Sequence, residues 1–331
     1  MENKNKGISG LCNLGNTCYI NSCLQLLSHT YKLNEKLDNE SLYKKLDTSR
    51  KESILLTEWN QLRQMLWKQN CVIEPNRFVN IIQHENTKFI RNTSCDACEF
   101  LEFLIDAFHE SLSRKTHITL DDSNDVCYQF IQTLYKDNYS DILSLFYGIQ
   151  IREISDASSN QVLSTKPEQF QILKLSIPSC STGVSIYDCL DNYFSTEMLK
   201  DDNAWFNEEL NTKQDVKICY QIWKFPKILI IQLKRWITGA TSKKDFTLVD
   251  IDSLQDFTIN LQKYHKNRCN TYYTLYGVCN HIGDVNGGHY TAYVKNSNRW
   301  FCINDTNVSM IPKEKVICNE NYLLFFHKNC N

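Results

Sequence analysis

The spacing of apolar residues changes once along this chain of 331 residues, and that change limits the possible folds. Up to about residue 145, apolar residues recur every three or four positions, which is typical of amphipathic helices. The clearest of these segments are 18–30, 53–70 and 94–115. Beyond residue 145, short runs rich in Ile, Leu and aromatic residues predict strands. These runs are 170–178, 225–236, 272–282, 289–295, 299–304 and 321–328. Helices followed by strands predict an α+β fold.

No repeat, low-complexity stretch or linker interrupts the chain. We therefore expect residues 1–331 to form a single domain with lobes, because a chain of this length can bury a core without disulfide or metal staples. The helical lobe is expected at about 7–144 and the strand-rich lobes at about 145–331. Ser94 is the predicted N-cap of the third helical segment, since a Ser side chain can accept from the free N–H groups of a helix start.

The charge balance and hydropathy exclude two classes of partner. The chain holds 36 basic and 38 acidic residues, a formal net charge of −2, whereas nucleic-acid binders carry a basic field. No apolar run approaches the roughly 18 residues that a membrane-spanning helix needs. The N-terminal MENKNKGISG has no apolar core, so we expect no secretory signal. We expect no nucleic-acid or membrane partner and a cytoplasmic or nuclear location, which would be the host-cell cytoplasm for a viral chain.

The 15 cysteines are odd in number and irregularly spaced, and in a reducing compartment we expect free, mostly buried thiols. Cys18 differs in its setting, because NLGNTCYINSCLQ (13–25) leads from a turn rich in Gly and Asn into helical spacing. With Asn16 or Thr17 as N-cap, Cys18 lies in the first helical turn, where free N–H groups and the helix dipole favour a thiolate. Asn13 supplies an amide donor of the kind that stabilises an oxyanion. The alternative interpretation is one more buried thiol.

A thiol nucleophile also needs a histidine base and a group that orients it. His289 stands out among the eight histidines because it follows DVNGG and opens the predicted strand HYTAYVK. The two glycines leave room for an extended substrate backbone. Asn304 and Asp305 end the next predicted strand, which a hairpin would return to His289, and either could accept from the imidazole N–H. A cysteine first and a histidine late is the order of papain-like proteases.

Four segments resemble, in the same order, motifs of the ubiquitin-specific protease family. GLCNLGNTCYINSCLQ (10–25) is similar to the cysteine box of that family. YTLYGVCNHIGDVNGGHYTAYVKN (273–296), followed by RWFCINDTNVS (299–309), is similar to its histidine box. DACEFLEFLIDAFHESL (96–112) resembles its intermediate helix, and FPKILIIQLKRW (225–236) resembles its core strand. The resemblance covers nearly the whole chain, from Gly10 to about Phe326.

The resemblance implies a papain-like fold with thumb, palm and fingers lobes. It implies hydrolysis of the bond that follows the C-terminal Gly-Gly of ubiquitin, usually an isopeptide bond to lysine. By position, Cys18 would be the nucleophile, His289 the general base and Asn13 the oxyanion donor. Asn304 aligns with the third catalytic residue and Asp305 with the adjacent acid. The sequence leaves open which of these two contacts His289.

The resemblance also implies residues that bind ubiquitin. Asp96 and Glu99 lie three apart on one helix face, where two carboxylates suit bidentate capture of an arginine. A solvated first turn, favoured by the helix dipole, is the other interpretation of these acids. Gly287 and Gly288 would let the thin tail of ubiquitin pass close to the backbone. Tyr290 would wall that channel or pack in the core.

The sequence departs from the family in the fingers, where many members bind a structural zinc through two CxxC pairs. The corresponding segments here, 147–164 and 204–217, contain no cysteine. Because a tetrahedral zinc site needs four ligands, we predict no metal site in the fingers. Packing of aromatic residues is expected to hold them instead, through Trp205, Phe206 and Phe170. The lone CxxC, CDAC (95–98), is interpreted as two packed or partly exposed thiols.

We therefore expect an active, monomeric deubiquitinase that acts on ubiquitin and ubiquitinated proteins without a metal or organic cofactor. Two alternatives differ from it in class. One is a non-catalytic pseudoenzyme that binds ubiquitin, against which the presence of Cys18, His289, Asn304 and Asn13 argues. The other is a protease for another ubiquitin-like modifier that ends in Gly-Gly.

Overall fold

The computed structural model describes residues 6–43, 46–90, 92–117, 125–179, 183–208, 210–237, 242–251, 255–284 and 287–329. Helices come first and strands later, and this segregation is that of an α+β fold. The change falls between Phe146, where the last helix of the first part ends, and Gly148, where the first long strand begins. One further helix, α9 (Ile186–Tyr193), lies among the strands.

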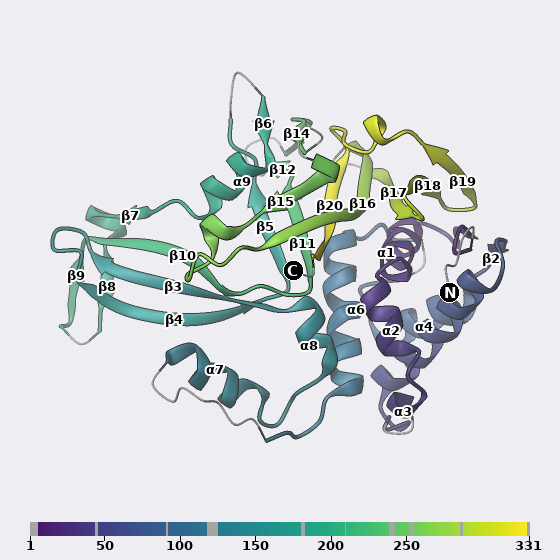
Figure 1. Cartoon of the computed structure of the whole chain (residues 1–331), viewed down its shortest axis with the longest axis horizontal. Coiled ribbons are helices and arrows are strands. Elements are labelled where there is room, and N and C mark those ends of the chain that lie inside the picture. The colour runs from purple at the N-terminus through teal and green to yellow at the C-terminus, as the bar shows by residue number, and fades with distance from the viewer. Residues whose placement is uncertain are drawn as a thin grey trace.

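The helices of the first part include one that is entirely buried, α1. In chain order they are α1 (Cys18–Ser28), α2 (Tyr31–Leu37), α3 (Glu40–Tyr43), α4 (Lys51–Lys68), α5 (Asn76–Glu85), α6 (Ala97–Leu112), α7 (Val126–Tyr135) and α8 (Asp141–Phe146). Every residue of α1 is buried, and α1 packs between α6 and interior strands of the main sheet (Figure 1). A short parallel pair, β1 (Gly10–Leu11) and β2 (Val72–Ile73), fixes the chain just before the turn that leads into α1.

The main sheet runs in the order β19-β18-β17-β16-β20-β11-β5, with β15 also paired to β16. Its strands are β5 (Ile172–Ser176), β11 (Ile228–Lys234), β15 (Thr258–Asn260), β16 (Tyr272–Asp284), β17 (Gly287–Asn296), β18 (Arg299–Asn304), β19 (Asn307–Ile311) and β20 (Asn321–Lys328). All six strand runs expected from the sequence lie in this sheet. β16, β17 and β18 form consecutive antiparallel hairpins, so the segment that carries His289 returns beside the segment that ends in Asn304.

The main sheet is buried on both faces, which explains its continuous apolar runs. Along β11, Ile228 and Ile230 belong to the core shared with the helices, whereas Leu229 and Ile231 belong to a second core that contains α9. Alternate residues of a strand point to opposite faces, so a run without polar interruption supplies both cores. The same alternation holds along β20.

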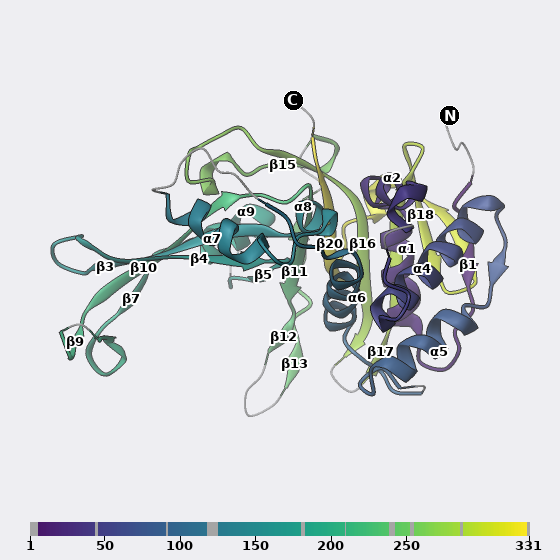
Figure 2. The same cartoon turned by 90° about the horizontal axis from the view of Figure 1, so that it is seen from below.

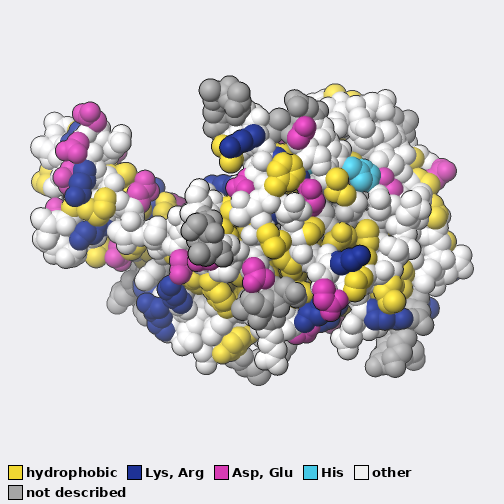
Figure 3. All heavy atoms as spheres, turned by 90° about the horizontal axis from the view of Figure 1, so that it is seen from above, with side chains coloured by type: hydrophobic (Ala, Val, Ile, Leu, Met, Phe, Trp, Pro, Cys, Tyr) yellow, Lys and Arg dark blue, Asp and Glu magenta, His cyan; other side chains and the backbone are white. Residues whose placement is uncertain are grey.

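A second sheet, in the order β4-β3-β10-β7, extends away from the body (Figures 1 and 2). It consists of β3 (Gly148–Asp156), β4 (Val162–Phe170), β7 (Glu197–Leu199) and β10 (Val216–Lys224), with the hairpin β8 (Trp205–Asn207) and β9 (Thr212–Gln214) beyond. We call these strands the fingers. Figure 3 shows them standing off from the body, with acidic and basic side chains interspersed on the visible surface.

The expected packing of aromatic residues in the fingers is wrong for Phe206, and Trp205 beside it is only half-buried. Phe206 is 49% exposed, and Phe170 belongs to the second core at the base of the fingers. Helix α7 braces the sheet instead: the rings of Tyr128 and Trp223 meet edge to face at 5.0 Å, and Gln169 Nε2 donates to the Tyr135 hydroxyl at 3.2 Å. Aromatic side chains therefore hold the fingers, but at the base rather than at the tip.

Two negative findings apply to the described ranges alone. None of the helices there combines the length and the apolar character that crossing a membrane requires. No group of three or more His, Cys, Asp or Glu side chains in those ranges is arranged to hold a metal ion. The absence of a finger metal in the protein stays a prediction.

Candidate active site

Cys18 is the first residue of α1, and the turn before it places it there. Gly15 and Asn16 both adopt positive φ, 102° and 54°, which glycine and asparagine tolerate best. Thr17 is the N-cap residue. Its hydroxyl accepts from the N–H of Leu14 at 2.8 Å, so it closes the turn rather than capping the helix. Cys18 is 8% exposed and lines a cleft of about 550 Å³.

The electrostatics of the thiol differ from what its place at a helix start suggests. Burial raises the pKa of the Cys18 thiol above its ordinary value. Hydrogen bonding to the backbone of Tyr290 and Tyr19 opposes that rise in pKa, while the carboxylate of Asp305 adds to it. The helix start therefore does not by itself make the thiol a thiolate near neutral pH, and a base is needed.

His289, near the start of β17, is held by Asn304, the last residue of β18. The distance from His289 Nε2 to Asn304 Oδ1 is 2.7 Å, whereas Asp305 Oδ2 lies 3.9 Å from the same nitrogen. Of the two candidates, Asn304 is thus the one in hydrogen-bonding contact. An amide oxygen can only accept, so Nε2 carries the proton and Nδ1 keeps a lone pair that can take a proton from a thiol.

Asp305 makes its closest contacts with the N-terminal segment rather than with the histidine. Its carboxylate accepts from Asn13 Nδ2 at 3.0 Å and from Asn21 Nδ2 at 2.8 Å, and its backbone carbonyl accepts from Leu11 N–H at 2.9 Å. The Asn13 side-chain oxygen in turn accepts from the N–H groups of Gly15 and Thr17, both at 3.1 Å. The amide of Asn13 is therefore fixed at both ends. Its nitrogen faces Asp305 and its oxygen faces the turn.

The two acids expected to bind ubiquitin make different side-chain contacts. Asp96, rather than Ser94, is the N-cap of α6: its carboxylate accepts from the N–H groups of Cys98 and Glu99 at 2.8 and 3.2 Å. It also accepts from the Tyr322 hydroxyl at 2.6 Å, and it lines the cleft. Glu99 is exposed and pairs with Lys88 at 2.7 Å.

The glycine pair and Tyr290 line the same cleft, as the channel interpretation expects. Tyr290 is buried, and burial raises the pKa of its hydroxyl. A Cβ on Gly288 would lie 2.3 Å from Nε2 of His281, whereas a Cβ on Gly287 would meet open space. Of these two glycines, only Gly288 lies so close to neighbouring atoms that a side chain would not fit.

His281 and Trp236 also line the cleft, although neither carries a local sequence signal that marks it. Their rings meet edge to face at 4.9 Å, and His281 also lies 4.7 Å from the ring of Tyr290. Burial, followed by the nearby charge of Lys244, lowers the pKa of His281 to about 4. The ring is therefore neutral near physiological pH.

A cysteine at a helix start, and a histidine held by an asparagine on the facing sheet, define the class of papain-like thiol hydrolases. Comparison with known families identifies one family within this class. The model of the family described as ubiquitin carboxyl-terminal hydrolase matches residues 9–326, and the chain belongs to that family.

Individual relatives agree with this assignment. Ubiquitin carboxyl-terminal hydrolase 2 of Gallus gallus is 32% identical, covering 97% of this chain and 93% of its own length. The Bos taurus protein of that name is 30% identical over 97% of this chain, which spans only 55% of it. This chain thus covers about half the length of several curated relatives. A chain of the SAGA DUB module bound to monoubiquitin matches all of this chain and 71% of its own with a TM-score of 0.79 at 25% identity.

Proposed function

We propose that the protein is a thiol-dependent deubiquitinase that hydrolyses isopeptide or peptide bonds after the C-terminal Gly-Gly of ubiquitin. The observation that carries the proposal is the 2.7 Å hydrogen bond from His289 to Asn304, in a site whose cleft is lined by Cys18. Relatives named ubiquitin carboxyl-terminal hydrolases and a structural neighbour bound to monoubiquitin support the substrate class.

In the proposed mechanism, Nδ1 of His289 takes the proton of Cys18, because burial disfavours spontaneous ionisation of the thiol. The thiolate attacks the carbonyl carbon of the terminal glycine. The imidazolium then donates its proton to the departing lysine amine, and a thioester remains. A water activated by the same imidazole hydrolyses that thioester and releases ubiquitin. None of these steps requires a metal or an organic cofactor.

Asn13 would donate to the oxyanion that forms in both steps, together with backbone N–H groups at the start of α1. One proton of Asn13 Nδ2 is donated to Asp305. This hydrogen bond fixes the amide group, so the second proton of Nδ2 also has a fixed direction. Preorganisation of this kind lowers the barrier because the donor need not reorient as charge develops.

Asp96, which lines the cleft, and Glu99 would receive the arginine-containing tail of ubiquitin. Because Glu99 pairs with Lys88, tail binding would require it to exchange that partner. Gly287 and Gly288, at the start of β17, would leave the tail room to lie against the strand, with Tyr290 as a wall. We propose that the protein acts on ubiquitinated proteins as a monomer in the cytoplasm or nucleus.

A ubiquitin that carries a C-terminal thiol-reactive warhead tests the proposal. The wild type should form a covalent adduct, and Cys18→Ala should form none. Parallel probes built on other modifiers decide the substrate class: an adduct with one of them alone would assign the protein to that modifier. A wild type that binds ubiquitin without an adduct would be a pseudoenzyme, and the proposal would then be wrong.

A further inference from the structure

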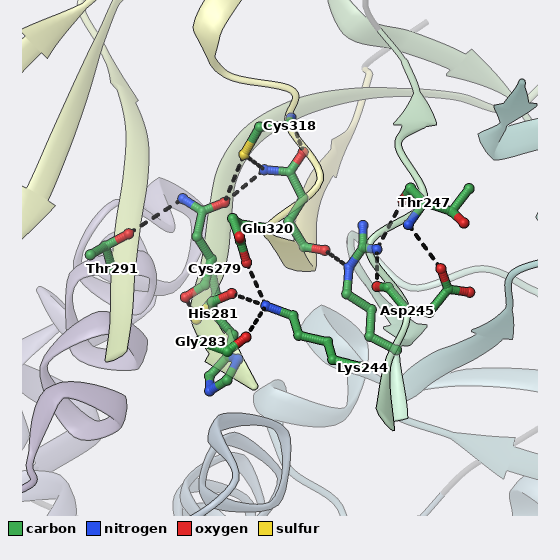
Figure 4. Close-up of polar contacts among 12 residues, drawn as sticks. Lys244, Asp245, Thr247, Cys279, His281, Gly283, Thr291, Cys318 and Glu320 are labelled. Carbon is green, nitrogen blue, oxygen red and sulfur yellow. Dashed lines mark hydrogen bonds and ion pairs between the residues drawn. The ribbon is translucent and has the colours of Figure 1, made fainter. Parts of the chain in front are cut away.

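A lysine is fully buried beside the cleft. Lys244 belongs to β13 (Lys243–Lys244), which pairs with β12 (Trp236–Ile237) in a hairpin visible in Figure 2. Its side chain has no exposed surface. The ammonium group donates to the backbone carbonyls of His281 and Gly283 and to the carboxylate of Glu320 (Figure 4). Three acceptors match the three N–H donors of an ammonium group, so the buried charge is fully satisfied.

The two carbonyls that Lys244 binds lie on either side of Ile282. In the β16–β17 ladder, Ile282 is the residue directly opposite His289, and Gly283 is opposite Gly288. The ammonium group therefore holds the end of β16 on both sides of Ile282, the residue paired with His289. Gly283 has a φ of +117°, and a Cβ there would lie 2.5 Å from the Gly287 carbonyl oxygen. The strand ends approach each other too closely at this point for a side chain.

The same lysine belongs to the hairpin that walls the cleft. Trp236 is its partner across β12 and β13, and Trp236 and Ile237 both line the cleft. The preceding residue, Arg235, is also fully buried. Its Nε donates to the carbonyl of Asn321 at 2.6 Å, and its Nη1 donates to the carbonyls of Asp245 and Thr247 at 2.8 and 2.9 Å. The base of the hairpin is thus fixed to the first residue of β20, and Lys244 makes the further connection to β16.

A buried ion pair is a poor source of stability, because desolvation cancels much of the attraction. In general, replacing a buried ion pair by apolar residues of similar volume often costs no stability. A charged group with three directed contacts instead fixes the relative position of the chain segments that it joins. The segments joined here are the cleft wall, the end of β16 and the residue that precedes β20.

We propose that Lys244 is a positioning residue of the active site. Its ammonium group, neutralised by Glu320, ties the cleft wall at Trp236 to the strand end opposite His289. It thereby sets the width of the substrate-tail channel and the placement of the imidazole. The reaction that this positioning serves is the one given under the proposed function, and the inference rests on it to that extent.

The test compares Lys244→Met with the double variant Lys244→Met/Glu320→Gln in the full chain. Lys244→Met should lower kcat/KM on a ubiquitin fluorogenic ester or amide by about tenfold to a hundredfold, since a misplacement of about 1 Å can cost that much. It should also lower the unfolding temperature, because the Glu320 carboxylate loses its partner. The double variant should regain the unfolding temperature but not the activity, since the contacts to the two carbonyls are still missing.

Two control variants separate positioning from stability. Lys263→Met removes another lysine–carboxylate pair, with Asp191 at 2.6 Å, in which both side chains are mostly exposed; it should keep wild-type activity. Leu190→Ala, in the second core, destabilises the fold without touching the cleft lining. If it matches Lys244→Met in both unfolding temperature and loss of activity, or if the double variant regains full activity, Lys244 is only structural and the inference is wrong.

A second measurement needs no ubiquitin. The rate at which iodoacetamide alkylates Cys18 near neutral pH reports the placement of His289, and Lys244→Met should slow it about tenfold. Should the wild type fail to hydrolyse ubiquitin, the proposed function is overturned, while slowed alkylation in Lys244→Met still supports the positioning role. Alkylation at the wild-type rate in Lys244→Met, with ubiquitin hydrolysis intact, would overturn the positioning role alone.

Discussion

At Cys18 two local effects oppose each other. The first N–H groups of α1 favour the thiolate, whereas burial of the sulfur raises the pKa of the thiol. Because burial is the larger effect, the reactivity of Cys18 near neutral pH should depend on His289. His289→Ala should slow alkylation by iodoacetamide at neutral pH, and the rate should keep rising with pH beyond about 9, the ordinary pKa range of a thiol. Mass spectrometry of the alkylated peptide measures this, and a plateau near neutral pH in the variant would contradict it.

Asn304 and Asp305 are neighbours with different contacts, so their variants should fail in different ways. Asn304→Ala releases the imidazole and should slow both alkylation and ubiquitin hydrolysis. Asp305→Ala releases Asn13 and should lower kcat about tenfold to a hundredfold, somewhat less than outright loss of an oxyanion donor. Since the Asp305 carboxylate also raises the pKa of the thiol, alkylation in Asp305→Ala should be no slower than in the wild type. Equal slowing of alkylation in both variants would show that Asp305 acts through His289.

At the scale of elements, regular periodicity was enough to predict α1, α4, α6 and six strands of the main sheet, but not its short strands β15 and β19. The ends of elements were harder, because Ser94 and Asp96 are both good caps and only the tertiary contact of Asp96 with Tyr322 favours one. The order of Asn304 and Asp305 was open for a related reason. Asn304 is the last residue of β18 and Asp305 lies just beyond it with a φ of +50°. Neither the register that places Asn304 nor the turn at Asp305 can be read from the local pattern.

The site residues missed from the sequence share one property: their contacts are made across distant segments. Asn21 meets Asp305 across 284 positions, and Lys244 meets Glu320 across 76. His281 and Trp236 line the cleft only because β12 and β16 converge there. No local sequence pattern predicts contacts between such distant segments. Cys18 and His289, in contrast, each follow a turn rich in Gly and Asn that can be recognised in the sequence.

His29, the C-cap residue that follows α1, makes the stability of the fold depend on pH. Its ring is fully buried, and burial lowers its pKa to about 4. The unfolded chain binds a proton near pH 6.5, whereas the native state does so only near pH 4. Stability is therefore fully present above about pH 6.5 and falls as the pH drops toward 4. His29→Gln should remove about 2 kcal/mol of the stability difference between about pH 7 and about pH 5.

Denaturant unfolding at several pH values measures that difference. His84→Gln, at a histidine whose side chain is 86% exposed, is the matched control and should keep the wild-type slope. A His29 variant with an unchanged slope would contradict the account. Part of the slope should persist in the variant, because burial also lowers the pKa of His281 to about 4.

At the scale of the whole molecule, the main sheet carries the site because both of its faces are buried. One core fixes α1, and with it Cys18, against β17. The other core fixes β11, β16 and β20 relative to α9 from the opposite side. The proposed nucleophile and the proposed base therefore lie on elements that cannot shift independently. The composition and the change of periodicity predicted this α+β arrangement, but the sequence could not show how the fingers are supported.

The fingers extend from this body, and their support at the base makes a prediction about metal. If packing against α7 holds them, EDTA or phenanthroline should leave the unfolding temperature unchanged, and added Zn²⁺ should not raise it. Trp223→Ala should instead destabilise the protein by about 2 kcal/mol, through the lost contact with the ring of Tyr128. Thermal unfolding with and without chelator, together with elemental analysis of the purified protein, measures both effects. Stoichiometric zinc whose removal lowers the unfolding temperature would show that the fingers rely on metal after all.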